Sequence, residues 1–184
     1  MSMSNNPAGR PRSENIDRRI LEETLRLARE DGYARVTMEA IARAAGVGKP
    51  SLYRRWPAKA HILFEALQMF GREALRFDDT GDLGADLTAG LVQVARLLAG
   101  PDGRLVSCLF AEAQFDETLK PELSAFLHAR REGARARLVA AGIANPDALL
   151  DRLYGPIIYR LLSGLDDLTD DFVADLVTHA LRGL

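Results

Sequence analysis

The chain has 184 residues, of which 47% are hydrophobic and 27% are charged, and its formal net charge at pH 7 is −2. This length suits one large helical domain, or a small domain followed by a larger one, and the apolar content is sufficient for a core. The single cysteine, Cys108, excludes an intrachain disulfide, the polar N-terminus lacks the apolar core of a signal peptide, and no apolar run approaches the roughly 20 residues of a membrane-spanning helix. We therefore expect a cytoplasmic protein with no membrane partner.

Charge is distributed unevenly along the chain. Residues 1–60 carry 12 Lys and Arg against 7 Asp and Glu, a net charge of +5. The remaining 124 residues carry 12 against 19, a net charge of −7. A basic N-terminal third on an acidic body is typical of a protein that turns one face to phosphate.

The first predicted elements are a polar arm and a helix. Residues 1–12 consist largely of Ser, Asn, Pro and Gly with Arg10 and Arg12, and this composition predicts a flexible arm. The two arginines could approach the minor groove of DNA, but the simpler interpretation is an uninformative terminus. Ser13 has the side chain of a helix cap, and an apolar stripe predicts a helix from there that Gly32 ends.

Residues 36–63 have the pattern of two short helices joined by a tight turn. Thr37 can cap the first helix, and Gly46 can adopt the left-handed conformation that ends it. Pro50 fits the first turn of the second helix, which has Leu52 as its one clear anchor. The apolar positions of the first helix fall at i, i+3, i+4 and i+7, and they are Met38, Ile41, Ala42 and Ala45. This pattern predicts a helix-turn-helix.

The second of these helices is too polar to be core, and it carries short and cationic side chains near its N-terminal end. A recognition helix presents that end to base edges in the major groove. Lys49 can donate to a guanine edge, and Ser51 can bond to either base type. Tyr53, Arg54 and Lys59 could bind phosphate, which fixes register but not sequence. The alternative is an ordinary pair of packed helices with a solvated charged face.

This segment closely resembles the DNA-binding domain of the TetR family of bacterial transcription regulators. The residues that carry the resemblance by order and spacing are Val36, Thr37, Ile41, Ala42, Ala45, Gly46, Val47, Leu52, Tyr53, Trp56, Lys59 and Leu63. One departure is Gly48, where the family usually has Ser or Thr as a cap, and this affects a phosphate contact but not the fold. We expect a helix-turn-helix domain over residues 13–58. Its expected DNA-binding residues are Thr37, Lys49, Pro50, Ser51, Tyr53, Arg54, Trp56 and Lys59.

A helix over residues 59–77 is expected to connect this domain to the body of the chain. The polar stretch from Asp78 to Leu83 marks the boundary, and residues 78–184 form the second domain, for effector binding and dimerisation. Its apolar stripes predict helices over 84–99, 103–115, 121–141, 146–162 and 169–181, and no segment alternates as a strand does. The predicted fold class is all-α, with nine helices.

The last two predicted helices are candidates for a subunit interface. Residues 149–162 are apolar around more than half of the helix circumference, which indicates burial on two sides. The resemblance implies the same, since family members are mostly homodimers through their final two helices. Two recognition helices set about one helical turn (~34–36 Å) or slightly more apart would read a palindromic operator. The expected interface residues are Leu150, Tyr154, Ile157, Ile158, Leu161, Phe172, Leu176 and Ala180.

The resemblance also implies a small-molecule effector held among the central helices of the second domain. The residues themselves support this only through a few polar groups among apolar ones, the usual lining of a ligand site. Each candidate could instead be core or plain surface. The candidates are Cys108, Phe110, Gln114, Phe115, Tyr154 and Tyr159.

Catalytic and metal chemistry find no support in the sequence. His61, His128 and His179 are scattered without the spacing of metal ligands, and there is no phosphate-binding loop or nucleophile elbow. We expect no enzyme, no cofactor and no metal, but a homodimeric regulator at the nucleoid, a repressor that an effector releases from double-stranded DNA. The alternatives are an activator, a regulator without an effector, and an interaction protein whose basic domain docks on an acidic protein.

Overall fold

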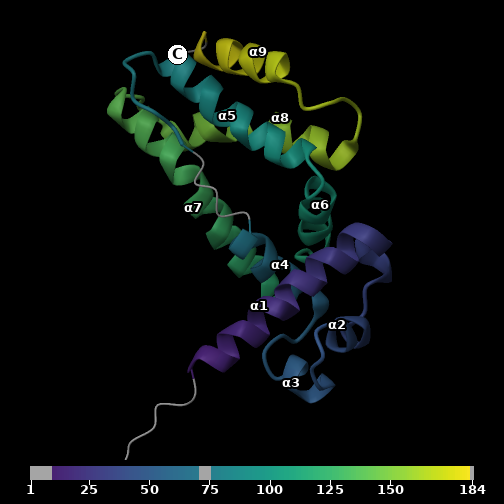
Figure 1. Cartoon of the computed structure of the whole chain (residues 1–184). Coiled ribbons are helices and arrows are strands. Elements are labelled where there is room, and N and C mark those ends of the chain that lie inside the picture. Colours follow the sequence, from purple (N-terminus) through teal and green to yellow (C-terminus); the bar gives the residue numbers. More distant parts are fainter. Residues whose placement is uncertain (1–9, 71–75, 183–184) are drawn as a thin grey trace, which may run out of the picture. The chain divides into compact units, whose positions relative to one another are not determined.

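The computed structural model describes residues 10–70 and 76–182, and this part of the chain contains nine α-helices and no strand (Figure 1). The prediction of an all-α fold with nine helices is confirmed. The contacts divide the chain into two compact units, Met1–Arg72 (unit 1) and Glu73–Leu184 (unit 2). Across the described residues, no helix has both the length and the apolar character to cross a membrane.

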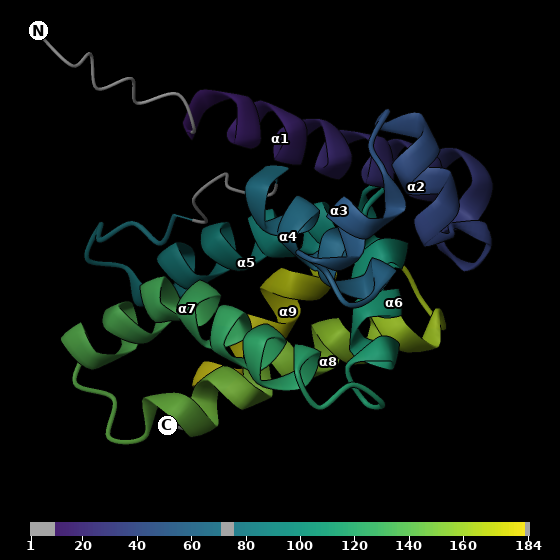
Figure 2. The same cartoon turned by 90° about the horizontal axis from the view of Figure 1, so that it is seen from below.

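Unit 1 is built on α1, which packs against both α2 and α4 (Figure 2). Its helices are α1 (Arg10–Leu27), α2 (Met38–Ala44), α3 (Lys49–Tyr53) and α4 (Lys59–Phe70), with a π-helical turn η1 (Ala28–Gly32) and a 3-10 turn η2 (Tyr33–Arg35) before α2. Its core draws on every helix and includes Ile20, Leu21, Leu25, Ile41, Leu52, Ile62 and Leu63. These residues lie at helical spacing, so each amphipathic helix buries one face.

The start of α1 differs from the prediction. α1 begins at Arg10, so Ser13 lies within the helix and is not its cap, and the predicted arm over residues 1–12 overlaps the helix. Arginine is a good helix former and Pro11 fits a first turn, so the polar composition does not prevent helix formation. The rest of the predicted arm, residues 1–9, lies outside the described residues. At its C-terminal end α1 continues into the π-helical turn, whose last residue is Gly32. Gly32 has φ of 82°, and it is the residue at which the sequence predicted the end of the helix.

Unit 2 is arranged around α5, which packs against all four of the other helices in the unit. Its helices are α5 (Leu83–Ala99), α6 (Gly103–Glu112), α7 (Leu119–Ala140), α8 (Pro146–Ser163) and α9 (Asp170–Leu181). Three of them start at a side-chain cap, because Asp82, Asn145 and Thr169 each accept a hydrogen bond from a backbone N–H three residues further on. The core includes Leu87, Leu91, Ala134, Leu138, Leu149, Leu150, Leu153, Ile157, Val173 and Val177.

The predicted connecting helix over 59–77 is too long. α4 ends at Phe70, residues 71–75 lie outside the described part, and residues 76–79 are not helical. Instead, Arg76 and Phe77 contact α5. The Gln93 side-chain amide donates to Arg76 O at 3.2 Å and accepts from Arg76 N at 3.4 Å, and the Phe77 ring lies against Gly90. These tertiary contacts outweigh the apolar periodicity that predicted a helix as far as Phe77.

One ion pair is buried in unit 2, between Asp86 of α5 and Arg137 of α7. Asp86 is 3% and Arg137 8% exposed, and Arg137 Nη2 donates to Asp86 Oδ2 at 2.7 Å. The Asp86 carboxylate also accepts bonds from the backbone N–H and the hydroxyl of Thr80. Burial acts to raise the pKa of Asp86, but the bonds from Thr80 and Arg137 outweigh it and hold the pKa below its usual value. The pair therefore fastens the segment before α5 to α7.

Candidate nucleic-acid interface

The first helix of the motif is held by a cap and a buried stripe. Thr37 is extended, and its Oγ accepts a hydrogen bond from Ala40 N at 3.1 Å, as predicted for an N-cap. The predicted apolar stripe is buried in unit 1: Met38, Ile41, Ala42 and Ala45. The opposite side of α2 is consequently exposed, and it carries Glu39 and Arg43.

The turn after α2 has the left-handed residue that the sequence predicts. Gly46 has φ of 64°, and its N–H donates to Arg43 O at 3.2 Å. Val47 N donates to Ala42 O at 2.9 Å, so two bonds close the end of the helix. A side chain with a Cβ would be strained at Gly46, and the turn sets the direction in which α3 starts.

α3 is a short helix held by one buried side chain. Leu52 is fully buried, whereas the other four residues of the helix are exposed: Lys49, Pro50, Ser51 and Tyr53. Gly48 precedes the helix without a side-chain cap, and its carbonyl accepts bonds from Ser51 N and Leu52 N. α3 thus presents small, polar and cationic side chains to solvent on a packed support, which is the arrangement that a recognition helix needs.

Lys49, the predicted base-reading residue, is paired within the chain. Its Nζ lies 3.0 Å from Glu39 Oε1 on the exposed side of α2, and both side chains are about half exposed. The hydrogen bond from Lys49 lowers the pKa of Glu39, so the carboxylate is charged at neutral pH. DNA must therefore compete with Glu39 for this ammonium group.

The end of α3 offers two side chains to phosphate. Tyr53 is 49% exposed, and Arg54, which follows it, is also exposed. Arg55 differs, because its guanidinium forms an ion pair with Asp17 of α1. Of the three neighbouring residues, Tyr53 and Arg54, the two predicted phosphate ligands, are therefore exposed, and Arg55 braces α3 against α1.

Trp56 is buried, which corrects its assignment to the DNA-binding set. Its side chain is 5% exposed, and its Nε1 donates to Glu65 Oε2 on α4 at 2.6 Å. An enclosed ring of this kind supports the end of α3 and offers no surface to DNA. The sequence could not separate the two roles, because an aromatic residue beside a basic helix suits either.

Lys59 also has a different environment from the one predicted. Its Nζ donates to Tyr33 O and to Val36 O, both at 3.0 Å, and lies 4.2 Å from the centroid of the Tyr33 ring. Two of its three N–H donors are thus used inside unit 1. These contacts make Lys59 a brace between η2 and α4, and the predicted phosphate contact is not supported by them.

Two exposed residues of α2 were missed in the sequence. Glu39 contacts Lys49, and Arg43 lies one turn further along the same exposed side of the helix. Their spacing of four residues, opposite the buried stripe, is a signal that could have identified them. Arg43 adds a cation that could meet phosphate beside α3.

In unit 2 a cleft between α6 and α7 contains two of the predicted effector residues. Its volume is about 290 Å³, and Phe110 at the end of α6 and Gln114 in the turn after that helix form part of its wall. Arg131 of α7 lines it too, and lies with its guanidinium 5.4 Å from the centroid of the Tyr154 ring. Tyr154 itself does not line the cleft. Burial raises the pKa of Tyr154 to about 12, so its hydroxyl keeps its proton at neutral pH.

The other predicted effector residues lie elsewhere. Phe115 is 91% exposed in the turn after α6, which corrects its assignment to a cavity wall. Cys108 is half-buried but does not line this cleft, and Tyr159 is 62% exposed on α8.

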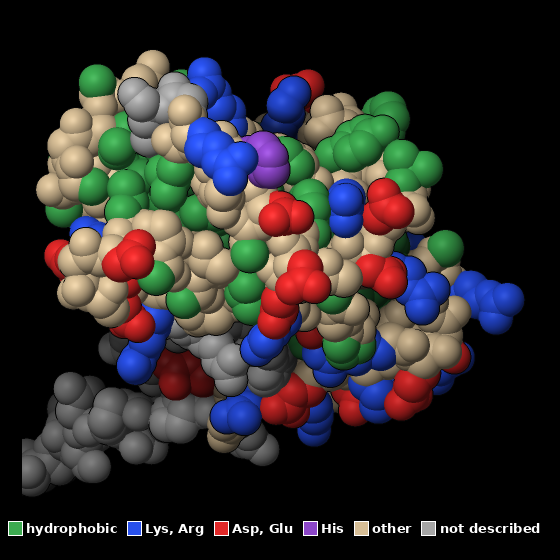
Figure 3. Space-filling model, turned by 90° about the horizontal axis from the view of Figure 1, so that it is seen from above, with side chains coloured by type: hydrophobic (Ala, Val, Ile, Leu, Met, Phe, Trp, Pro, Cys, Tyr) green, Lys and Arg blue, Asp and Glu red, His purple; other side chains and the backbone are tan. Residues whose placement is uncertain are grey.

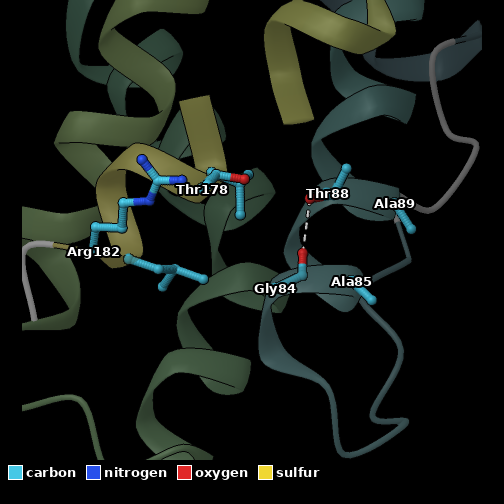
Figure 4. A pocket seen from close by; sticks show the side chains of 8 residues that line it. Gly84, Ala85, Thr88, Ala89, Thr178 and Arg182 are labelled. Atoms are coloured by element: carbon cyan, nitrogen blue, oxygen red, sulfur yellow. Dashed lines mark hydrogen bonds between the residues drawn. The ribbon is translucent and has the colours of Figure 1, made fainter. Parts of the chain in front are cut away.

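A second groove lies between α5 and α9, and its volume is about 710 Å³. Figure 4 shows its α5 wall of small residues, with Ala85 and Ala89 beside Thr88, whose hydroxyl donates to Gly84 O at 2.8 Å. Arg182 lies on the α9 side. None of the predicted effector residues lines this groove.

The predicted dimer residues divide into two groups. Leu150 and Ile157 are at most 1% exposed and belong to the core of unit 2, so their assignment to a subunit interface is corrected. The others are half-buried: Tyr154, Ile158, Leu161, Phe172, Leu176 and Ala180. Tyr159 and Leu162 of α8 are 62% and 53% exposed. Figure 3, which looks down on the side of unit 2 that carries α9 in Figure 1, shows hydrophobic side chains in two groups separated by charged ones.

Both units match known family models. Residues 20–66 match the model of bacterial regulatory proteins of the tetR family. Residues 77–180 match the model of the tetracyclin repressor-like C-terminal domain. The two models together cover the helix-turn-helix and most of unit 2.

Individual relatives cover nearly the whole chain. The HTH-type transcriptional regulator YdeS of Bacillus subtilis is 32% identical in an alignment of 185 positions, which covers 96% of this chain and 93% of that protein. The DNA-binding transcriptional repressor TetR of Mycobacteroides abscessus is 29% identical over 92% of this chain and 84% of its own. Among solved structures, the TetR family transcription regulator SCO0332 has a TM-score of 0.72 at 33% identity, covering 92% of this chain and 98% of that one.

Proposed function

The chain belongs to the TetR family of bacterial transcription regulators, and from this premise we propose that it is a homodimeric repressor, which binds a palindromic operator and leaves it when a small-molecule effector binds. The family consists of DNA-binding regulators, so the chain is not an enzyme. Its place of action is expected to be the cytoplasm, at the nucleoid.

The exposed N-terminal half of α3 is the observation that carries the proposal. Lys49 and Ser51 stand on a helix that Leu52 anchors in the core, so they can enter a major groove without loss of packing. In the proposed complex these two residues contact base edges, and Tyr53 and Arg54 contact phosphates beside them. Thr37 and Pro50, at the starts of α2 and α3, shape the surface on either side.

Dimerisation would supply the second half of the operator contact. A single five-residue helix reads too few base pairs to be selective, whereas two related by symmetry read a palindrome. The exposed Tyr159 and Leu162, with the half-buried Ile158 of the same helix, support α8 as the centre of the interface. Phe172 and Leu176 of α9 would complete an isologous four-helix packing with the partner chain.

Release by an effector follows from a two-state equilibrium. An effector that binds better to a dimer whose recognition helices are wrongly spaced lowers the affinity for DNA, and DNA lowers the affinity for the effector by the same factor. The cleft between α6 and α7, with mixed polar and apolar walls, supports such a site within unit 2.

Fluorescence anisotropy of the purified chain with labelled DNA from upstream of its own gene tests the proposal. We expect binding that survives excess random duplex and weakens steeply with salt, because phosphate contacts release counterions. A selection from random duplexes finds the operator if it lies elsewhere. Failure of both to yield a preferred sequence would overturn the proposal. A reporter on the operator separates a repressor from an activator, since loss of a repressor raises transcription.

A further inference from the structure

We propose that the cleft between α6 and α7 binds an organic anion with an apolar body, its head held by Arg131 and Lys120. The binding is argued from the cleft itself. The role of this anion as the effector rests on the proposed function.

The cleft is formed by one face of α7 and by the end of α6 with the residues that follow it. Its α7 residues lie on one face at i, i+3, i+4, i+7, i+8 and i+11, and they are Lys120, Leu123, Ser124, Leu127, His128 and Arg131. The opposite wall consists of Phe110 in the last turn of α6 and of Ala113 and Gln114, which directly follow that helix. Both helices pack on α5 and α8, so the walls are held by the core of the unit.

The chemistry of the lining is amphipathic and cationic. Phe110, Leu123 and Leu127 supply apolar surface, whereas Lys120 and Arg131 are positively charged. The lining residues of this cleft include no Asp or Glu, although unit 2 as a whole is acidic. A cation would be repelled by these two charges, whereas an anion with an apolar body matches both the cationic and the apolar part of the lining.

Arg131, which lines the cleft, has a hydrogen-bond donor without an acceptor. One of its terminal nitrogens, Nη2, bonds to Asp151 Oδ1 at 2.7 Å. Its Nε is buried and has no hydrogen-bond partner among the described residues, and the same holds for the hydroxyl of Tyr154, against whose ring the guanidinium lies. Buried polar atoms are nearly always hydrogen-bonded in proteins, so the Arg131 side chain is left short of one acceptor. A carboxylate or phosphate oxygen provides one.

The volume of the cleft indicates the size of a suitable probe ligand. A volume of about 290 Å³ equals the share of roughly ten water molecules in the liquid, so an anion of roughly ten non-hydrogen atoms fills it. Octanoate has this size and provides a carboxylate on an unbranched apolar chain. Octyl phosphate provides the alternative anionic head and also has eight carbon atoms in an unbranched chain.

Titration calorimetry of the full chain tests the proposal with four unbranched ligands of eight carbon atoms each: octanoate, octyl phosphate, 1-octanol and octylamine. We expect octanoate or octyl phosphate to bind, and 1-octanol and octylamine to bind at least about tenfold more weakly, since a hydrogen bond to a charged group is lost. The tighter of the two anions identifies the head as carboxylate or phosphate. Equal binding of octylamine and octanoate, or no binding of either anion at millimolar concentration, would overturn the proposal.

Variants locate the binding. Lys120→Gln, at an exposed position, should weaken anion binding about threefold to fivefold, and Arg131→Gln should weaken it about tenfold or more. Arg104→Gln is the matched control, because Arg104 is exposed on α6 and outside the lining, and it should change nothing. Ser124→Trp should abolish binding by filling the cleft while the circular dichroism spectrum is retained. Unchanged binding in Ser124→Trp places the anion elsewhere and overturns the assignment.

The effector role is measured separately, as the change in operator affinity when the anion is added. Binding in the cleft without any change in DNA affinity leaves the site in place and removes its regulatory role. Loss of the operator preference in the anisotropy experiment concerns the proposed function alone, since calorimetry contains no DNA.

Discussion

Glu39 of α2 and Lys49 of α3 lie 3.0 Å apart, Oε1 to Nζ, so the side chain expected to read a base edge is held by an acidic neighbour in its own chain. The carboxylate has two opposed effects on DNA binding. It orients the lysine, and it repels phosphates that approach within a Debye length of about 8 Å. Because both side chains are exposed, the pair itself contributes little to stability, and its effect is expected in binding.

Glu39→Gln should strengthen binding to operator and random DNA alike, by up to about fivefold at low salt, because one negative charge beside the phosphates is removed. Lys49→Ala should weaken operator binding and relax the preference at one base position by about 1–3 kcal/mol. Anisotropy with the operator and its single-base variants measures both effects. Tyr53→Phe serves as the control, since it should weaken all sequences equally. A similar loss of base preference in Lys49→Ala and Tyr53→Phe would contradict these roles.

Lys59→Met should lower the stability of the helix-turn-helix unit by about 1–3 kcal/mol, because two carbonyls lose a charged donor and the Tyr33 ring loses its cation. Thermal unfolding followed by Trp56 fluorescence reports on this unit, since Trp56 is the only tryptophan. Random-DNA affinity of the folded variant should fall less than in Arg54→Gln. A larger loss of random-DNA affinity in Lys59→Met than in Arg54→Gln would support Lys59 as a phosphate ligand after all.

Leu162→Lys should convert a dimer into a monomer, because a charge at the centre of an apolar interface is left without a partner. Light scattering after size-exclusion chromatography measures the mass. Val139→Lys is the matched control, since Val139 is also an exposed apolar residue but lies on α7. A Leu162→Lys variant that remains dimeric would exclude this face of α8 from the interface.

Gly90→Ala should destabilise unit 2 by about 1–3 kcal/mol, although alanine is the better helix former. A Cβ at this position would lie 2.3 Å from Cδ1 and Cε1 of the Phe77 ring. A double-mutant cycle with Phe77→Ala tests whether the ring is the cause of the destabilisation. In a Phe77→Ala background the same Gly90→Ala change should become neutral or stabilising, as measured by chemical denaturation. If the effects of the two substitutions on the free energy of unfolding were additive, the packing of the Phe77 ring would not depend on the absence of a side chain at Gly90.

The Asp86–Arg137 pair predicts an acid-sensitive contribution to the stability of unit 2. The folded pKa of Asp86 is lowered, so its stabilising effect is fully present above the unfolded value of about 4 and is lost as the pH falls through the folded value. Asp86→Asn should therefore lower Tm by several degrees at neutral pH, and the difference from the parent should shrink below pH about 4. Asp147→Asn is the control, because Asp147 is exposed and the side chain of its partner Arg135 is still 41% exposed. A Tm difference that is constant with pH would exclude the charge as its cause.

Local features of the sequence predicted much of the fold and the core of the site. Thr37 caps α2, Gly46 takes positive φ, and the stripe around Ile41 is buried, as their positions indicated. Each of these depends on dihedral preference or on helical periodicity within a few residues of the chain. That is why they can be predicted without knowing what packs against them.

Tertiary structure decided which partner each ambiguous side chain meets. Trp56 is buried in the core of unit 1, although the sequence suited a contact with DNA equally well. Lys59 donates to two backbone carbonyls and not to the predicted phosphate, and Leu150 packs in the core of its own unit and not against a second subunit. Phe77 is not helical, although its position fits the apolar periodicity of the predicted helix. Its ring packs against Gly90, which is distant in the sequence. An apolar face or a long cation has no intrinsic partner. Its free energy depends on the groups that the fold brings within contact distance, and these are not encoded by its neighbours in the chain.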